Sequence, residues 1–194
     1  MGGYVFEIES EKKASAQIVA CDLAKFSLKE DNLQLHRFRK LHGGLLKALE
    51  NIDPKSEIVV LPTGDGLVIG VIGAELEPVA LQIAFQLLES LHVESLDKEL
   101  RVGVHVGPVY HLIGKRGEHQ LIGVGINKAA RVESAGTEGR VLVSEEYFSM
   151  FLDRSGDDFQ RRLIKGEPEE FRIKKEPTFK ARFVEWGEIG KLEE

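Results

Sequence analysis

Apolar and polar positions follow two different periods along the chain, and the period changes several times. Residues 16–21 form a compact apolar run that stops at Asp22, which is typical of a buried strand. From Asp31 onward, apolar residues recur every three or four positions, as on one face of a helix. The pattern predicts, in order, a strand at 16–21, a helix from 31 to the Asp53-Pro54 break, a hairpin of strands 58–61 and 66–72, a helix at 80–91, a strand at 100–106, a helix at 126–134, a strand at 140–143, a helix opening at Ser144, and strands at 159–164, 171–173 and 179–184.

This order of strands and helices predicts an α+β fold. The helices are expected on one face of a mostly antiparallel sheet, because each element needs a partner layer to bury its apolar side. Residues 1–15 are polar and are predicted to be an N-terminal leader, followed by one folded domain at 16–186 and a C-terminal tail at 187–194. Residues 111–120 are polar and contain glycines, which predicts an exposed arm.

Composition and charge narrow the setting of the protein. The 194 residues include 26 Lys and Arg against 32 Asp and Glu, a net charge of −6. That balance argues against nucleic acid or an anionic membrane surface as a partner. The apolar stretches are too short to span a bilayer and no secretory signal is visible, so we expect a cytoplasmic protein. Cys21 is the single cysteine, which excludes an internal disulfide and a thiolate zinc cluster.

Two aspartates are candidates for a metal site. Asp22 stands where a buried strand ends, and Asp65 stands at the tip of the hairpin Thr63-Gly64-Asp65-Gly66. Strands of one sheet can bring such positions together, and paired carboxylates suit Mg²⁺ or Mn²⁺. The glycines beside Asp65 allow a tight turn and let a phosphate approach the backbone. Taken singly, each aspartate is more simply explained as a turn residue or a strand terminator.

A second candidate group lies on the predicted short helix. Asn127 and Arg131 are four residues apart, so they project from the same helix face. Ala129 and Ala130 keep the helix slim, and an amide beside a guanidinium suits the recognition of a phosphoryl group. Without further context, an exposed arginine and an asparagine near a helix start explain the pair more simply.

Six segments fall into a familiar order. Residues 17–27 place apolar residues before Asp22 and Phe26-Ser27 after it, and residues 123–134 contain Asn127 and Arg131 in a Gly-x-x-x-Asn-x-Ala-x-Arg pattern. The other segments are 63–66, 100–109, 139–144 and Ile164-Lys165-Gly166. Together they resemble the class III nucleotide cyclases, the family of adenylate and guanylate cyclases, from about residue 16 to about residue 185. Each segment alone is weak evidence for the resemblance, but six matching segments in the same order are not expected by chance.

The resemblance implies a ferredoxin-like cyclase catalytic domain that converts a nucleoside triphosphate to a 3′,5′-cyclic nucleotide and pyrophosphate. Two Mg²⁺ or Mn²⁺ ions per site are implied as cofactors. In the family the site forms head-to-tail between two chains, and this chain carries both halves, which implies a homodimer. The roles carried over are metal binding by Asp22, Leu23 and Asp65, contacts to the nucleotide by Phe26, Ser27, Gly64 and Lys165, ribose orientation by Asn127, and stabilisation of charge at the α-phosphate by Arg131.

The residues near the base pocket leave the substrate base open. Leu61 and Gln120 stand near the positions where purine-specific members carry Lys and Asp. Leucine cannot hydrogen-bond a base, whereas the amide of Gln120 can both donate and accept. Two alternatives remain: a purine read by another residue, or a pyrimidine from UTP or CTP, as in the cyclases of bacterial anti-phage signalling.

A catalytically silent module that binds a nucleotide as a sensor is the alternative function. The four core positions, Asp22, Asp65, Asn127 and Arg131, are all filled, which favours the enzyme. The altered base pocket keeps the sensor as an alternative function.

The six histidines are scattered, with no pair at metal-ligand spacing on one helix face. They are interpreted as structural or solvated residues rather than as ligands or catalysts. They are His36, His42, His92, His105, His111 and His119.

Overall fold

The computed structural model describes residues 6–50, 52, 56–73, 77–93, 95–152, 157–173 and 176–187. Residues 1–5 and 188–194, which belong to the predicted leader and tail, lie outside the described residues, as does the Asp53-Pro54 break. None of the helices in the described ranges has the length and apolar character needed to cross a membrane.

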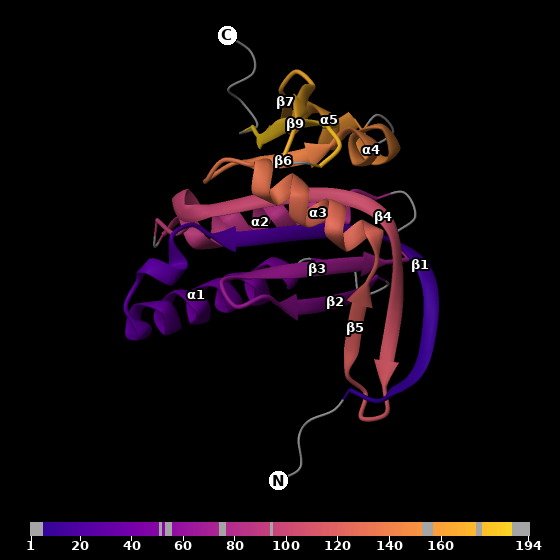
Figure 1. Cartoon of the computed structure of the whole chain (residues 1–194). Helices are drawn as coiled ribbons and strands as arrows, with labels where there is room; N and C mark the ends of the chain where they lie inside the picture. Colours follow the sequence, from indigo (N-terminus) through magenta and orange to yellow (C-terminus); the bar gives the residue numbers. More distant parts are fainter. Residues whose placement is uncertain are drawn as a thin grey trace.

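Nine strands in the described residues form one sheet in the order β2-β3-β1-β4-β6-β9-β7, with β5 paired to β4 and β8 paired to β9 (Figure 1). All pairs are antiparallel except β4 with β6. The mostly antiparallel sheet and the α+β class are therefore confirmed. The strands are β1 (Ile8–Leu23), β2 (Glu57–Pro62), β3 (Gly66–Ile72), β4 (Leu100–Gly114), β5 (His119–Ile122), β6 (Val141–Ser144), β7 (Leu163–Lys165), β8 (Glu169–Phe171) and β9 (Phe179–Trp186).

The helices pack on both faces of this sheet, so the expectation of helices on one face is wrong. In Figure 1, α3 crosses one face and α2 lies behind the sheet. The central strand β1 explains the arrangement, because it is apolar on both sides. Val19 and Cys21 belong to the core under α1 and α2, whereas Ile18 and Ala20 belong to the core under α3. The helices are α1 (Asp31–Leu49), α2 (Val79–His92), α3 (Val124–Ala135), α4 (Glu145–Tyr147) and α5 (Asp157–Arg162), with 3₁₀ turns η1 (Phe26–Leu28) and η2 (Asp97–Glu99) and a π-helical turn η3 (Phe148–Leu152).

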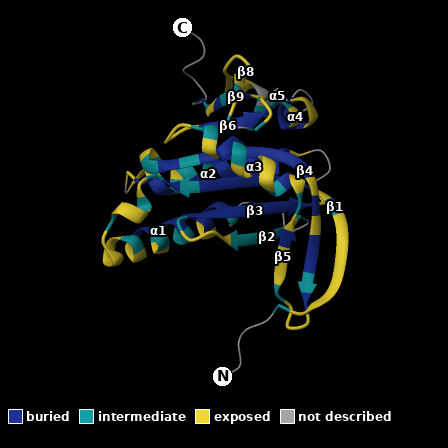
Figure 2. Cartoon of the chain, viewed as in Figure 1, coloured by how far each residue is buried: buried dark blue, intermediate teal, exposed yellow. Residues whose placement is uncertain are grey.

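The first strand is longer than its apolar run predicts. Residues 8–15, placed in the leader by their polarity, form the first half of β1 and pair with β4 out to Gly114. Figure 2 shows this half exposed and the second half buried. With β5 and the end of β4, it forms a projecting three-stranded arm, which agrees with the arm predicted at residues 111–120. A strand that is exposed on both faces carries no apolar alternation, which is why the sequence pattern missed it.

Two tail elements differ from their predictions. The strand expected at 171–173 is instead β8, Glu169–Phe171, which shares only Phe171 with the expected range. Residues 159–164 were expected to be a strand, but α5 occupies them up to Arg162 and only then does β7 begin. Phe159 packs edge-on against Trp186, with ring centroids 5.1 Å apart. The segment holds only three apolar residues, so its period is too short to separate a helical turn from a strand.

Candidate active site

The end of β1 and the tip of the β2–β3 hairpin lie side by side. In the β1–β3 register Asp22 stands opposite Gly66, and the Leu23 N–H donates to the Asp65 carbonyl at 3.1 Å. The Thr63 N–H donates to the Gly66 carbonyl at 3.0 Å and closes the turn. Gly66 is required here, because a Cβ at this position would come within 1.9 Å of the Cys21 carbonyl oxygen. The two aspartates are therefore neighbours.

The Asp22 carboxyl lies between a carboxylate and a guanidinium. Burial raises its pKa, the hydrogen bond from Arg101 opposes that rise, and the charge of Asp65 adds to it. Arg101 Nη2 donates to Asp22 Oδ2 at 2.5 Å, while its Nε lies 3.1 Å from Glu133 Oε1. Burial also raises the pKa of Glu133 to about 7, against the lowering effect of Arg101.

This carboxylate pair fits the divalent ions that the sequence analysis implies. Asp22 and Asp65 repel each other, and each offers hard oxygen ligands, which are the donors that Mg²⁺ and Mn²⁺ prefer. Arg101 was not singled out from the sequence as a neighbour of this pair. Its signal was a charged residue at the start of a buried strand, but only the β1–β4 register places it opposite Asp22.

The segment after Asp22 turns sharply into η1. Leu23 is 1% exposed, so its side chain belongs to the core and only its backbone faces the site. The Ala24 N–H donates to the Glu99 carbonyl at 2.8 Å, and Lys25 has a φ of 57°. Phe26 packs against the core under α1 and α2, and Ser27 follows it in the same turn. Gly64, on the facing hairpin, has a φ of 95° and open space around its Cβ position.

Helix α3 lies unusually close to the sheet. A Cβ on Gly103 would come within 2.2 Å of the Glu133 nitrogen, and one on Gly125 would come within 3.0 Å of Pro108 O. Glycines at both contacts let the helix backbone approach the strand. This close packing fixes the face from which Asn127 and Arg131 project.

Arg131 already has a partner within the chain. Its Nε forms an ion pair with Glu176 Oε2, in the segment that precedes β9. Arg131 also lines a cavity of about 260 Å³ together with Lys128, His105 and Ser144. In the described part of the chain, no hydrogen bond or ion pair joins Asn127 or Arg131 to Asp22 or Asp65.

The three remaining predicted residues are spread over three strands. Leu61 on β2 is half-buried against the core under α3, and Gln120 on β5 is exposed. Lys165 ends β7 with its Nζ 5.5 Å from the ring centroid of Phe148. Among the predicted site residues, the structure brings Asp22 and Asp65 together, and Asn127 and Arg131 form a second group on α3.

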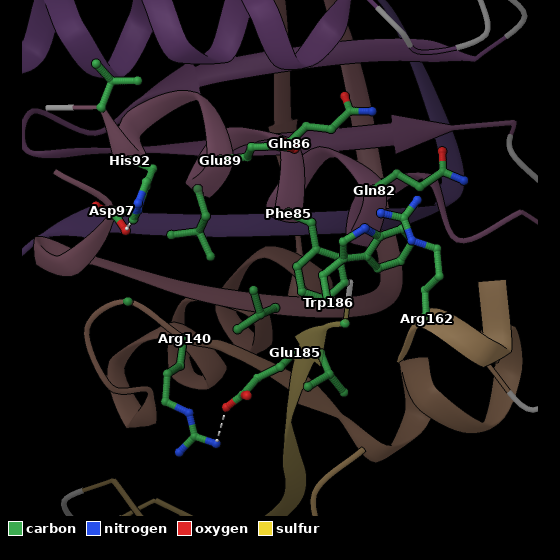
Figure 3. A pocket seen from close by; sticks show the side chains of 16 residues that line it. Gln82, Phe85, Gln86, Glu89, His92, Asp97, Arg140, Arg162, Glu185 and Trp186 are labelled. Carbon is green, nitrogen blue, oxygen red and sulfur yellow. Dashed lines mark hydrogen bonds and ion pairs between the residues drawn. The ribbon is translucent and has the colours of Figure 1, made fainter. Parts of the chain in front are cut away.

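A larger cavity than the one beside Arg131 lies elsewhere in the described residues. A cavity of about 740 Å³ separates α2 from the ends of β6 and β9 (Figure 3). Arg162 stacks over the Trp186 ring at 4.2 Å, and Arg140 pairs with Glu185 at 3.1 Å. None of the predicted site residues lines this cavity.

The sequence matches a protein-family model, the adenylate and guanylate cyclase catalytic domain, over residues 68–174. That range is more than half of the chain. The chain belongs to this family. It is therefore a nucleotide cyclase. The match contains Gln120, Asn127, Arg131 and Lys165, and it begins three residues after Asp65, so both aspartates lie before it.

Solved structures of cyclases share the fold of this cyclase domain. The adenylyl cyclase CyaB from P. aeruginosa superimposes with a TM-score of 0.68 at 14% identity, covering 91% of this chain and 96% of that one. The guanylate cyclase domain of RhGC from Catenaria anguillulae, solved with GTP, gives 0.68 at 18% identity, with 91% and 100% covered. Adenylate cyclases from Trypanosoma brucei, solved in a monomeric state, give 0.62 at 18% identity, with 88% of each chain covered.

Proposed function

We propose that the cyclase converts a nucleoside triphosphate to its 3′,5′-cyclic nucleotide and pyrophosphate, with two Mg²⁺ or Mn²⁺ ions held by Asp22 and Asp65 in a site shared between two copies of the chain. The observation that carries the proposal is the β1–β3 register. It sets the two carboxylates side by side at the end of a rigid sheet.

The reaction makes one bond and breaks another. The ribose 3′-oxygen bonds to the α-phosphorus, the bond from that phosphorus to the α–β bridging oxygen breaks, and the hydroxyl proton leaves to water or a phosphate oxygen. The bound ions supply charge neutralisation on the phosphates and a lower pKa for the 3′-hydroxyl.

The side chains of the protein hold and orient the substrate. The N–H groups of Leu23 and Ala24 are already bonded to carbonyl oxygens, so the triphosphate cradle falls on the following turn, which contains Phe26 and Ser27. Arg131 stabilises the charge that develops at the α-phosphate, Asn127 orients the ribose, and Lys165 binds the outgoing pyrophosphate.

The separation of the two residue groups supports a site shared by two chains. Asp22 and Asp65 meet at the hairpin tip, while Asn127 and Arg131 project from α3 and make no contact with them in the described residues. Within one chain Arg131 is neutralised by Glu176, and Asp22 is neutralised by Arg101. A second copy arranged head to tail would bring an α3 group to each aspartate pair, and closed two-fold pairs are the commonest oligomers.

The proposal also concerns which base the site recognises. Leu61 cannot hydrogen-bond a base and packs toward the core, which leaves the exposed Gln120 amide as the polar group at the family's base-reading positions. An amide presents a donor and an acceptor, so it suits the Watson–Crick edge of a pyrimidine as well as that of a purine.

The direct test offers ATP, GTP, CTP and UTP separately with Mn²⁺ and measures cyclic product by mass spectrometry. We expect product from one triphosphate. Arg131→Ala is expected to lower the rate by about 10² to 10³, as for the loss of other preorganised donors to a transition state. Asp65→Ala should abolish the reaction, and Lys180→Ala, an exposed change on β9, serves as the control.

The altered base positions favour one second candidate, a sensor that binds a triphosphate without cyclising it. Equilibrium binding separates the two functions. Tight, Mn²⁺-dependent binding of one triphosphate with no cyclic product would replace the enzyme by the sensor, and turnover that persists in Asp65→Ala would contradict both.

A further inference from the structure

Three metal-ligating side chains meet where the arm passes the start of β2. They are Glu57 on β2, His111 on β4 and His119 on β5. One ligand atom from each lies within 4.8 Å of the others. His111 Nε2 is 2.8 Å from His119 Nδ1, and Glu57 Oε1 is 3.6 Å from His111 Nδ1 and 3.8 Å from His119 Nδ1. The interpretation of these two histidines as scattered single residues is therefore wrong.

His111 and His119 come into contact because the β4–β5 hairpin folds the arm back on itself. His111 and His119 are eight residues apart in sequence, a spacing that matches no helical metal motif. The β4–β5 register sets His111 opposite Leu121, so His119 is its diagonal neighbour on the same face. Their rings stack with centroids 5.0 Å apart.

The burial of the cluster resembles that of a metal site more than that of a surface patch. The His111 side chain is 4% exposed, while His119 and Glu57 are 41% and 48% exposed. A buried ligand gives a fixed anchor, and two half-open ligands leave a path for an ion to enter. Ligand atoms around tetrahedral Zn²⁺ lie about 3.3 Å apart, given metal–nitrogen bonds near 2.0–2.1 Å. With His111 Nε2 and His119 Nδ1 as the nitrogen ligands, their separation of 2.8 Å and the 3.8 Å from His119 Nδ1 to Glu57 Oε1 bracket that value.

We propose that Glu57, His111 and His119 bind one Zn²⁺ ion, in a site separate from the carboxylate pair. Two imidazole nitrogens with one carboxylate oxygen are a ligand set for Zn²⁺ rather than Mg²⁺, which prefers oxygen ligands throughout. Three protein ligands leave the fourth position to water. Two ring nitrogens 2.8 Å apart can share one proton or face one ion, and the nearby carboxylate favours the cation.

The zinc site lies far from the proposed catalytic ions. Glu57 is the first residue of β2 and Pro62 is its last, a span of about 17 Å of extended strand, and Asp65 lies in the turn beyond Pro62. The zinc proposal can therefore be tested independently of the cyclase reaction.

Bound zinc would tie three strands together. It joins the start of β2 to both strands of the β4–β5 hairpin, which otherwise projects from the sheet. His119 directly precedes Gln120, and β5 leads through Gly123 into α3. The ion would thus fix the arm relative to the sheet.

The test measures zinc affinity against a chromophoric chelator in excess Mg²⁺. The background is an Asp22→Asn, Asp65→Asn chain, which removes the other carboxylate site. We expect one Zn²⁺ per chain, and a loss of affinity of at least about tenfold in His119→Gln and in Glu57→Gln. These variants change the more exposed ligands and spare the buried His111. His36→Gln, on the exposed face of α1, is the matched control and should bind like its parent.

Two further readouts keep the result clear of folding effects. Zinc should raise the thermal midpoint of the parent chain and of His36→Gln but not that of His119→Gln. Co²⁺ should give the visible absorption of a tetrahedral nitrogen–oxygen site only where His119 is intact. If the parent binds zinc no more tightly than His119→Gln, the two histidines form a hydrogen bond only and the proposal is overturned.

Discussion

His105 is a buried residue of β4, and its burial favours the uncharged imidazole. It is 2% exposed, and its Nδ1 lies 2.8 Å from Ser144 Oγ. That hydroxyl also accepts the Tyr147 N–H as the cap of α4. Burial favours the neutral imidazole and lowers its pKa from 6.5 to about 4.

This environment predicts a specific dependence of stability on pH. Between pH 6.5 and pH 4 the unfolded chain takes up a proton at His105 that the folded chain refuses, so stability falls as the pH falls. The free energy of unfolding should drop by about 2 kcal/mol between pH 7.5 and pH 5 through this group alone. Urea denaturation of the parent and of His105→Gln at both pH values measures the difference.

The exposed His36→Gln variant is the control and should keep the full pH dependence of the parent. Equal losses in the parent and in His105→Gln would show that His105 does not carry the effect.

Single residues also mark how far the site could be predicted. Asp22 and Asp65 were within reach because a strand end and a hairpin tip are local features of the sequence. Arg101 and Glu133 were not, because their contact with Asp22 depends on the β1–β4 register and on the close seat of α3. The His111–His119 pair was missed for the same reason, since it depends on a cross-strand register.

At the scale of elements, α1 offers a matched pair of glycines. A Cβ on Gly43 meets nothing within 4 Å, whereas one on Gly44 comes within 2.7 Å of Ser90 Oγ and 3.0 Å of Leu91 Cδ2 on α2. Gly44 is thus the point at which α2 packs closely against α1.

We expect Gly43→Ala to stabilise the fold by about 0.5–1 kcal/mol, because alanine restricts the unfolded chain and favours the helix. Gly44→Ala should destabilise it by about 1–3 kcal/mol through overpacking against α2. Chemical denaturation of the two variants side by side gives both signs, and shifts in the same direction would contradict the packing described here.

Elements with a sustained apolar period were predicted well. The helices α1, α2 and α3 and the strands β3 and β6 lie close to where their patterns placed them. The first half of β1 and the short α5 were not found, since the first has no buried face and the second has too few apolar residues to show a period.

At the scale of the whole molecule, the two separate residue groups predict complementation between inactive chains. Asp65→Ala and Arg131→Ala should each abolish or strongly lower cyclisation alone. Mixed and allowed to exchange, half of the dimers would be heterodimers with one intact site of two. About a quarter of the parent activity is then expected.

Product formation in the mixture, measured against each variant alone, tests the shared site. A mixture of Arg131→Ala with Arg131→Lys is the control, and its cyclase activity should not recover. Absence of recovery despite verified subunit exchange would show that each chain builds its site by itself.

The unbroken pairing of β1 has a consequence for how this cyclase can change in length. From Ser10 to Leu23 every residue of β1 faces a partner on β4, with the single irregularity lying before Ser10. Inserting or deleting one residue between Ala14 and Ala20 would turn every side chain on one side of the change to the opposite face. The arm can therefore lengthen or shorten only in steps of two residues, matched on β4, or by changes at its tip. The alternation of side chains between the two faces of the sheet therefore sets the step in which the length of the arm can change.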